Sequence, residues 1–189
     1  KKLQYNFFNP IIFVLILWQI RLYEVNQEIS FVRFGLFPRE VFGLKGIISW
    51  IFIHGSNDHL LSNTFPLLIL GAALYYFYDK LANWVLLNIY IFTGIFVWIF
   101  AKPVYHIGAS GLVYGMFGFL FFGGIFRKDK VSIALSLLVT LFYGGIIWGI
   151  FPVQPNVSWE GHLFGLLTGL TLSYYFRKDY LPKKKIYDE

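Results

Sequence analysis

The stretch HIGASGLVYGMFG, residues 106–118, joins a polar loop to an apolar run that is broken by glycines. It places Ser110 between Gly108 and Gly111, at the point where a helix is expected to begin. The first N–H groups of a helix have no partner within it, so they point towards any negative charge that develops beside the serine. The pattern suits a nucleophilic serine, but taken alone, small residues at this position more often serve helix packing.

The composition indicates a membrane protein. Of 189 residues, 57% are hydrophobic, 22% aromatic and only 14% charged, which is typical of a polytopic membrane protein. The chain has no cysteine, which excludes disulfides and thiolate metal sites. Its net charge of +6 comes from short basic clusters between apolar runs, a distribution that favours membrane topology over nucleic-acid binding. The first apolar run lacks a small-residue cleavage site, so we expect it to be retained.

Apolar segments long enough to cross a bilayer recur six times along the chain, since a spanning helix needs roughly 17–25 residues. The predicted fold class is therefore all-α, a polytopic membrane protein built as a bundle of six transmembrane helices. We expect residues 1–189 to form one such domain. The six segments lie near 7–23, 57–77, 83–101, 109–126, 131–150 and 160–177.

The loops between these segments fall into two sets, one on each side of the membrane, and their charges differ. One set carries eleven basic residues: Lys1, Lys2, Lys80, Arg127, Lys128, Lys130, Arg177, Lys178 and Lys183 to Lys185. The other carries five: Arg21, Arg33, Arg39, Lys45 and Lys102. Because basic residues are enriched in cytoplasmic loops, both termini are predicted to be cytoplasmic and the long first loop to lie outside.

Polar residues occur at the outer ends of the second, fourth and sixth segments. His59 and Asn63 share one face of the second segment, Ser110 and Tyr114 share a face of the fourth, and His162 lies in the sixth. These three segments run in the same direction, so their polar groups are expected at similar depth. Polar side chains inside a membrane are costly, and each is therefore a functional candidate.

Glycines at four-residue spacing predict that the fourth and sixth segments approach closely. The fourth carries Gly111 and Gly115, and the sixth carries Gly161, Gly165 and Gly169. If these faces meet, His162 comes within hydrogen-bond reach of Ser110. The alternative is that the glycines only pack helices and that His162 is an ordinary interior histidine with its hydrogen bonds satisfied.

Three motifs together resemble those of the rhomboid intramembrane serine proteases. They are His54 with His59-x-x-x-Asn63, then Gly108-Ala-Ser110-Gly111, then Gly161-His162-x-x-Gly165-x-x-x-Gly169. They fall on three separate segments in the family's order, and the resemblance covers essentially the whole six-helix core. It implies an intramembrane endopeptidase that uses a Ser-His dyad, with neither a cofactor nor a metal ion.

The resemblance also assigns roles to residues. Ser110 would be the nucleophile and His162 its general base. His59, Asn63 and the backbone N–H of Ser110 would form the oxyanion hole, and Tyr114 would pack on the His162 ring. Supporting positions would be Gly108, Gly111 and Gly165.

The same resemblance implies partners and a location. Substrates would be transmembrane proteins, cut near the outer end of a helix, and the chain would span the lipid bilayer of a bacterial plasma membrane. The active site would open to the outer side. One feature departs from the family: many rhomboids carry a Trp-Arg pair in the first outer loop, and Lys45 and Gly46 take its place here. The pattern alone therefore leaves the anchoring of this loop open.

Several alternatives remain. The chain could be a catalytically inactive rhomboid-like protein that binds membrane clients, although it retains Ser110 and His162. A transporter or channel would more naturally show buried carboxylates or inverted repeats. A zinc enzyme could use three histidines, His54, His59 and His162. Ser110 and Asn63 would then have no task.

His106 is a competing candidate for the base. It lies four residues before Ser110 in the sequence. A residue ahead of the Gly108 turn need not face the serine, however, whereas His162 lies among helix-packing glycines.

Overall fold

The structure is a computed structural model that describes residues 2–153 and 157–178, with side chains from Asn9 onward. This part of the chain contains seven α-helices and no β-strand. The α-helices are α1 (Lys2–Asn26), α2 (Gly46–Ser49), α3 (Asn57–Phe77), α4 (Ala82–Phe100), α5 (Ser110–Arg127), α6 (Lys130–Tyr143) and α7 (Trp159–Tyr175). Short 3-10 helices are η1 (Val32–Phe34), η2 (Val41–Lys45), η3 (Trp50–Phe52), η4 (Gly144–Ile150) and η5 (Phe176–Lys178).

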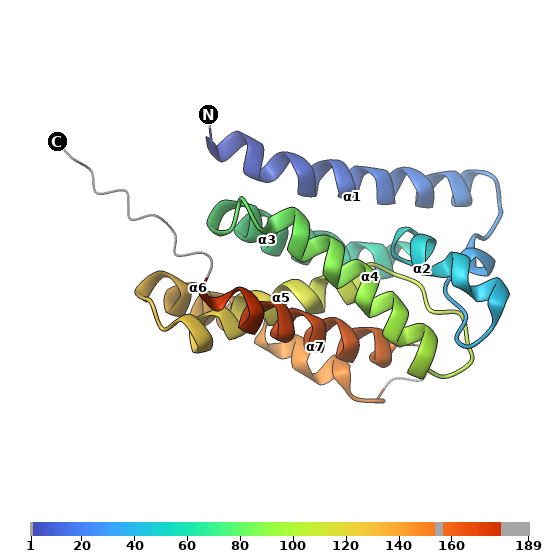
Figure 1. Ribbon diagram of the computed structural model, residues 1–189. Coiled ribbons are helices and arrows are strands. Elements are labelled where there is room, and N and C mark those ends of the chain that lie inside the picture. The colour runs from blue at the N-terminus through green and yellow to red at the C-terminus, as the bar shows by residue number, and fades with distance from the viewer. Residues whose placement is uncertain (1, 154–156, 179–189) are drawn as a thin grey trace.

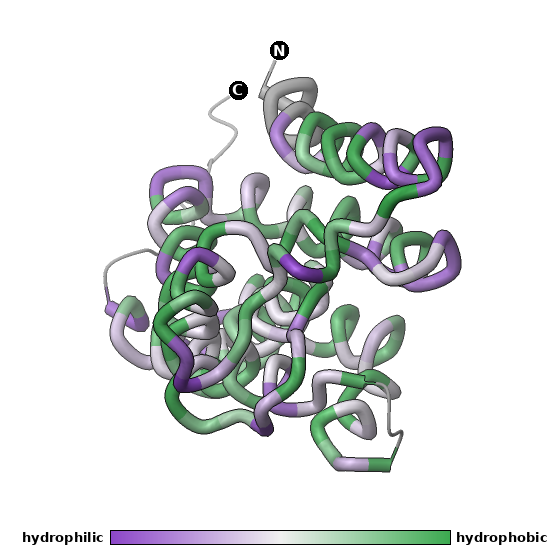
Figure 2. Tube along the Cα trace, turned by 90° about the vertical axis from the view of Figure 1, so that its right-hand side faces the viewer, coloured by the Kyte–Doolittle hydropathy of each residue, from purple (hydrophilic) through white to green (hydrophobic). Residues whose placement is uncertain are grey.

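The predicted all-α membrane fold is confirmed, but the count of six spanning helices is not. Within residues 2–153 and 157–178, four helical segments are long and apolar enough to cross a membrane, namely 57–77, 82–100, 110–127 and 130–150. The helices α1 and α7 cover the first and sixth predicted segments, and α7 has 17 residues. The seventh helix is α2, four residues long, which forms inside the first loop. Hydrophilic residues occupy only short stretches of the chain in Figure 2.

Successive long helices run in alternating directions (Figure 1). As a result, α3, α5 and α7 begin at the same end of the bundle, while α1 starts and α7 finishes at the opposite end. The helix α5 lies in the middle, in contact with α3, α4, α6 and α7. Most of its residues, glycines among them, are buried. The polar residues singled out on α3, α5 and α7 therefore lie at one end of the molecule.

The predicted close approach of α5 and α7 is confirmed. A Cβ atom added at Gly165 would overlap the carbonyl oxygen of Gly111, and one at Gly169 would overlap the carbonyl oxygen of Gly115. At Gly118 an added Cβ would lie 2.7 Å from the Leu166 carbonyl oxygen. The two helices thus touch backbone to backbone, and side chains larger than hydrogen have no room there.

The first loop is anchored without the Trp-Arg pair. Leu36 and His106 exchange two backbone hydrogen bonds, of 2.8 and 3.0 Å, which tie this loop to the one that leads into α5. The Arg39 guanidinium donates to the Ala101 carbonyl, 2.6 Å away, at the end of α4. A Cβ at Gly46 would lie 2.5 Å from the Leu36 nitrogen, so the loop folds tightly on itself.

Candidate active site

Ser110 is the first residue of α5, directly after a turn at Gly108. Gly108 has φ +106°, a conformation that side chains rarely adopt. A Cβ at this position would also lie 2.7 Å from two atoms of the His59 ring. The glycine therefore lets the chain turn and lets His59 approach the loop, while the N–H of Ser110 stays at the open start of the helix.

The Ser110 hydroxyl and the His162 ring are joined by a hydrogen bond of 2.8 Å between Oγ and Nε2. The other ring nitrogen, Nδ1, lies 2.8 Å from the Gly149 carbonyl oxygen. A carbonyl can only accept, so Nδ1 carries the hydrogen and the lone pair of Nε2 faces the serine. Nε2 can thus accept the proton of Ser110, which is what a general base for a serine nucleophile requires.

Tyr114 holds the histidine ring from one face. The two rings are stacked, with centroids 4.1 Å apart and planes inclined by 5°. The Tyr114 hydroxyl donates to the Ile146 carbonyl oxygen at 2.6 Å. The His162 ring is therefore fixed by a stacked neighbour and by hydrogen bonds at both of its nitrogens.

The structure brings His59 to the loop before Ser110 and places Asn63 one turn further along α3. The N–H of His59 donates to Ser56 Oγ at 3.0 Å, the cap that starts this helix. Asn63 is buried, and its side-chain amide donates to the His59 carbonyl at 2.9 Å. Both partners of this hydrogen bond belong to α3, so it does not connect Asn63 to Ser110.

His54 supports the same loop. Its side chain is 1% exposed, and its Nε2 accepts a hydrogen bond of 3.2 Å from the Ala109 N–H. Its ring meets the His59 ring edge-on, with centroids 5.0 Å apart. Burial, together with the neighbouring His59, lowers the pKa of His54 to about 3. His54 is therefore neutral at pH 7, as its accepting role requires.

His106, the competing candidate for the base, is occupied elsewhere. Its Nε2–H donates to the Lys102 carbonyl at 3.0 Å, and its Nδ1 accepts from the Ser158 hydroxyl at 2.6 Å. Ser158 also caps α7 by accepting from the Gly161 N–H. The pKa of His106 is lowered by burial. The ring ties the loop before α5 to the start of α7 and is not available to Ser110.

Comparison with known proteins identifies the family of this chain. The family model for the rhomboid domain matches residues 42–179. The chain belongs to the rhomboid family. It is 33% identical over 171 residues to an uncharacterized protein of Mycobacterium tuberculosis, covering 86% of this chain and 71% of that protein. It is 30% identical over 134 residues to "Putative rhomboid protease YdcA" of Bacillus subtilis, covering 68% of this chain and 65% of that protein.

Two contributors to the rhomboid site were missed by sequence reasoning. Trp50 is 1% exposed, its carbonyl accepts from the Gly108 N–H at 2.9 Å, and its ring fills the space where a Gly111 side chain would be. A large apolar residue in a loop close to His54 was a usable signal. Gly149 lies in a region predicted as one continuous helix, where glycines are poor helix formers and could have suggested a break.

The zinc alternative finds no support in the rhomboid site. Across residues 2–153 and 157–178, no three side chains of His, Asp or Glu come together as metal ligands. His54 and His59 are adjacent, but His162 is hydrogen-bonded to Ser110 and to a backbone carbonyl.

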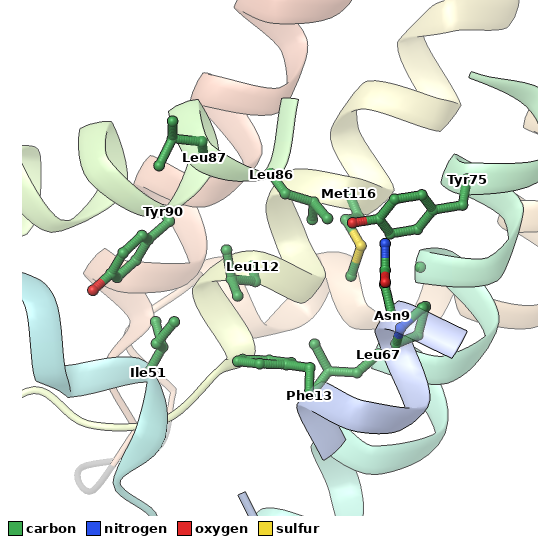
Figure 3. A pocket seen from close by; sticks show the side chains of 12 residues that line it. Asn9, Phe13, Ile51, Leu67, Tyr75, Leu86, Leu87, Tyr90, Leu112 and Met116 are labelled. Atoms are coloured by element: carbon green, nitrogen blue, oxygen red, sulfur yellow. The ribbon is translucent and has the colours of Figure 1, made fainter. Parts of the chain in front are cut away.

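A cavity of about 300 Å³ in this rhomboid chain lies away from Ser110 and His162. Its lining comes from α1, α3, α4, α5 and Ile51, and is almost entirely apolar (Figure 3). Leu112 and Met116 of α5 face it, whereas neither Ser110 nor His162 does. A lining without charged groups offers nothing to activate water or to stabilise an oxyanion.

Proposed function

We propose that this rhomboid-family chain is an intramembrane serine endopeptidase that cleaves transmembrane segments of other membrane proteins. The observation that carries the proposal is the 2.8 Å hydrogen bond between Ser110 Oγ and His162 Nε2, with Nδ1 held by a carbonyl. Serine hydroxyls are poor nucleophiles, and an adjacent, correctly oriented imidazole is what activates them.

The reaction follows from this arrangement. Ser110 Oγ attacks the substrate carbonyl carbon while its proton moves to His162 Nε2, giving a tetrahedral oxyanion and an imidazolium. The imidazolium then returns the proton to the departing amine as the C–N bond breaks, leaving an acyl-serine ester. Water, deprotonated by the same nitrogen, hydrolyses the ester and restores both residues.

The oxyanion would be held by the N–H of Ser110 together with the side chains of His59 and Asn63. Support for this assignment comes from the place of Ser110 at a helix start and from the His59 ring against Gly108. Removing one such donor typically costs about 10²–10³ in kcat. Asn63 would act through an amide hydrogen other than the one it donates to the His59 carbonyl.

The orientation in the membrane is part of the proposal. Both termini would be cytoplasmic and the site would open to the outer side of a bacterial plasma membrane, with α1 as the first span and α7 as the last. The basic residues support this orientation, because Lys80, Arg127, Lys128, Lys130, Arg177 and Lys178 follow α3, α5 and α7 at the end opposite Ser110.

Activity-based labelling and cleavage test the proposal. The protein would be reconstituted with a model transmembrane substrate and, separately, treated with a serine-directed fluorophosphonate in detergent. We expect a single cut and labelling that are both lost in Ser110→Ala. The matched control is Ser158→Ala, which removes the hydroxyl of the second Ser-His hydrogen bond in the described residues. It also removes the cap of α7, so it should lower the melting temperature but keep both labelling and cleavage.

Two outcomes would overturn the proposal that this chain is an endopeptidase. Labelling and cleavage that persist in Ser110→Ala would move the nucleophile elsewhere. A folded wild-type protein that neither cleaves nor labels would favour the alternative, an inactive rhomboid-like protein that binds membrane clients.

A further inference from the structure

The segment η4, which continues α6 as a 3-10 helix, contacts both aromatic rings of the site through its backbone. The Gly149 carbonyl is 2.8 Å from His162 Nδ1, and the Ile146 carbonyl accepts from the Tyr114 hydroxyl at 2.6 Å. Neither carbonyl was expected from the motifs. Both come from one stretch of seven residues, so a single element sets the position of the histidine and of the ring stacked on it.

We propose that Gly149 is a positioning residue whose carbonyl holds His162 in the tautomer that can act as a base. This proposal rests on the proposed function and adds how the general base of that function, His162, is oriented. In the described residues no carboxylate bonds to His162, so the place filled by aspartate in a Ser-His-Asp triad is taken here by a backbone carbonyl.

The chemistry of a carbonyl explains why it is sufficient. Neutral imidazole carries one N–H, and an acceptor at Nδ1 favours the tautomer with that hydrogen on Nδ1 and a lone pair on Nε2. The carbonyl keeps its hydrogen bond when His162 becomes an imidazolium, and it takes no proton itself. Loss of the group that holds the tautomer in an aspartate triad costs about 10⁴ in kcat. A neutral acceptor contributes less, so we expect a loss of about 10–100-fold.

The residue type at position 149 follows from the same contacts. A Cβ at Gly149 would overlap the Tyr114 hydroxyl and lie 3.1 Å from both Tyr114 Cζ and His162 Nδ1. Any side chain would push the carbonyl away from the histidine or push Tyr114 off its ring. Gly145, in the same segment, has no atom within 4 Å of an added Cβ. The need for glycine is therefore local to position 149.

Because η4 continues α6, the base depends on where this helix lies. Leu141, Phe142 and Trp148 are exposed, so the α6–η4 unit presents much of its surface outward. In the bundle it is held mainly by α5 and α7. Displacing η4 would remove both carbonyls from the site at once and leave His162 without a fixed tautomer.

Four variants in the full chain test the proposal: Gly149→Ala, Gly145→Ala, Tyr114→Phe and the double variant Gly149→Ala with Tyr114→Phe. We expect Gly149→Ala to lower kcat about 10–100-fold with KM unchanged, and Gly145→Ala to behave as wild type. Removing the Tyr114 hydroxyl takes away the atom that the new methyl group overlaps. The double variant should therefore recover part of the activity lost in Gly149→Ala.

A direct readout is ¹⁵N NMR of the histidine rings, with His162 assigned from the spectrum of His162→Gln. In the wild type we expect Nδ1 protonated and Nε2 unprotonated, and in Gly149→Ala a mixture of tautomers. This measurement needs no activity, so it tests the positioning even if the wild type fails to cleave and the proposed function falls. A wild-type ring protonated at Nε2, full kcat in Gly149→Ala, or no recovery in the double variant would overturn the proposal.

Discussion

Replacing Gly165 by alanine tests whether catalysis depends on backbone contact between α5 and α7. The added Cβ would overlap the Gly111 carbonyl oxygen and lie 3.1 Å from its carbon, closer than ordinary van der Waals contact. Backbone cannot rotate out of the way as a side chain can, so α7 must retreat by about 1 Å. The Ser110–His162 distance of 2.8 Å would then exceed hydrogen-bond range.

Both stability and rate should respond. Overpacking costs about 1–3 kcal/mol of folding free energy, and a displacement of about 1 Å costs about 100-fold in rate. Gly165→Ala is therefore expected to fold, to unfold at a lower temperature, and to lose about 99% of kcat.

The assay is steady-state cleavage alongside a melting curve on the same preparation. The matched control is Gly123→Ala at the far end of the same interface, where an added Cβ meets only two side-chain oxygens, of Tyr78 at 3.3 Å and Ser173 at 3.7 Å. Gly123→Ala should keep most activity. Wild-type kcat in Gly165→Ala would refute the reasoning, because the two helices would then tolerate separation at the dyad.

Further changes test the other parts of the site. Asn63→Ala should lower kcat about 10–1000-fold with KM and melting temperature nearly unchanged; a large loss of thermal stability with kcat preserved would make Asn63 a packing residue. His162→Ala should abolish cleavage while His106→Ala leaves most of it, and the reverse pattern would transfer the role of base. Because the folded pKa of His54, about 3, lies below its ordinary 6.5, the unfolded state binds more protons in that window. As the pH is lowered below 6.5, the free energy of unfolding should thus fall by at most about 1.4 kcal/mol per pH unit. In His54→Gln the melting temperature should fall less steeply with decreasing pH, and an equally steep fall would contradict this. A reporter fused after Glu189 should be active only in the cytoplasm, and external activity would invert the proposed topology.

Much of the candidate site could be predicted from the sequence because it consists of polar residue types that are rare in membrane-spanning segments. A serine between glycines at the start of a span, and histidines inside apolar segments, are costly unless they are used. The four-residue glycine spacing on α5 and α7 predicted a contact that brings Ser110 and His162, 52 residues apart, to 2.8 Å. These signals are local in sequence or periodic, so they do not depend on knowing the fold.

Other features could not be read because they belong to backbone groups or to loops. Every residue has a backbone carbonyl, so nothing in the amino-acid sequence distinguishes the Gly149 carbonyl, which accepts a hydrogen bond from His162. The choice between His162 and His106 likewise required distances between side chains. Each ring is hydrogen-bonded to a serine, but only the partner of His162 is Ser110, the first residue of α5. The short helix at residues 46–49, inside the first loop, was not predicted because four residues show no periodicity.

The sequence by itself determined the class of the molecule, a helical membrane protein of the rhomboid family, because hydropathy and residue spacing act along the chain. Tertiary structure alone decided which groups surround Ser110 and His162. Trp50 fills the space beside Gly111, His54 accepts from the residue before the serine, and η4 turns its carbonyls towards His162 and Tyr114. The physical reason is that hydrogen-bond direction and steric fit depend on positions in space, which only packing of the helices sets.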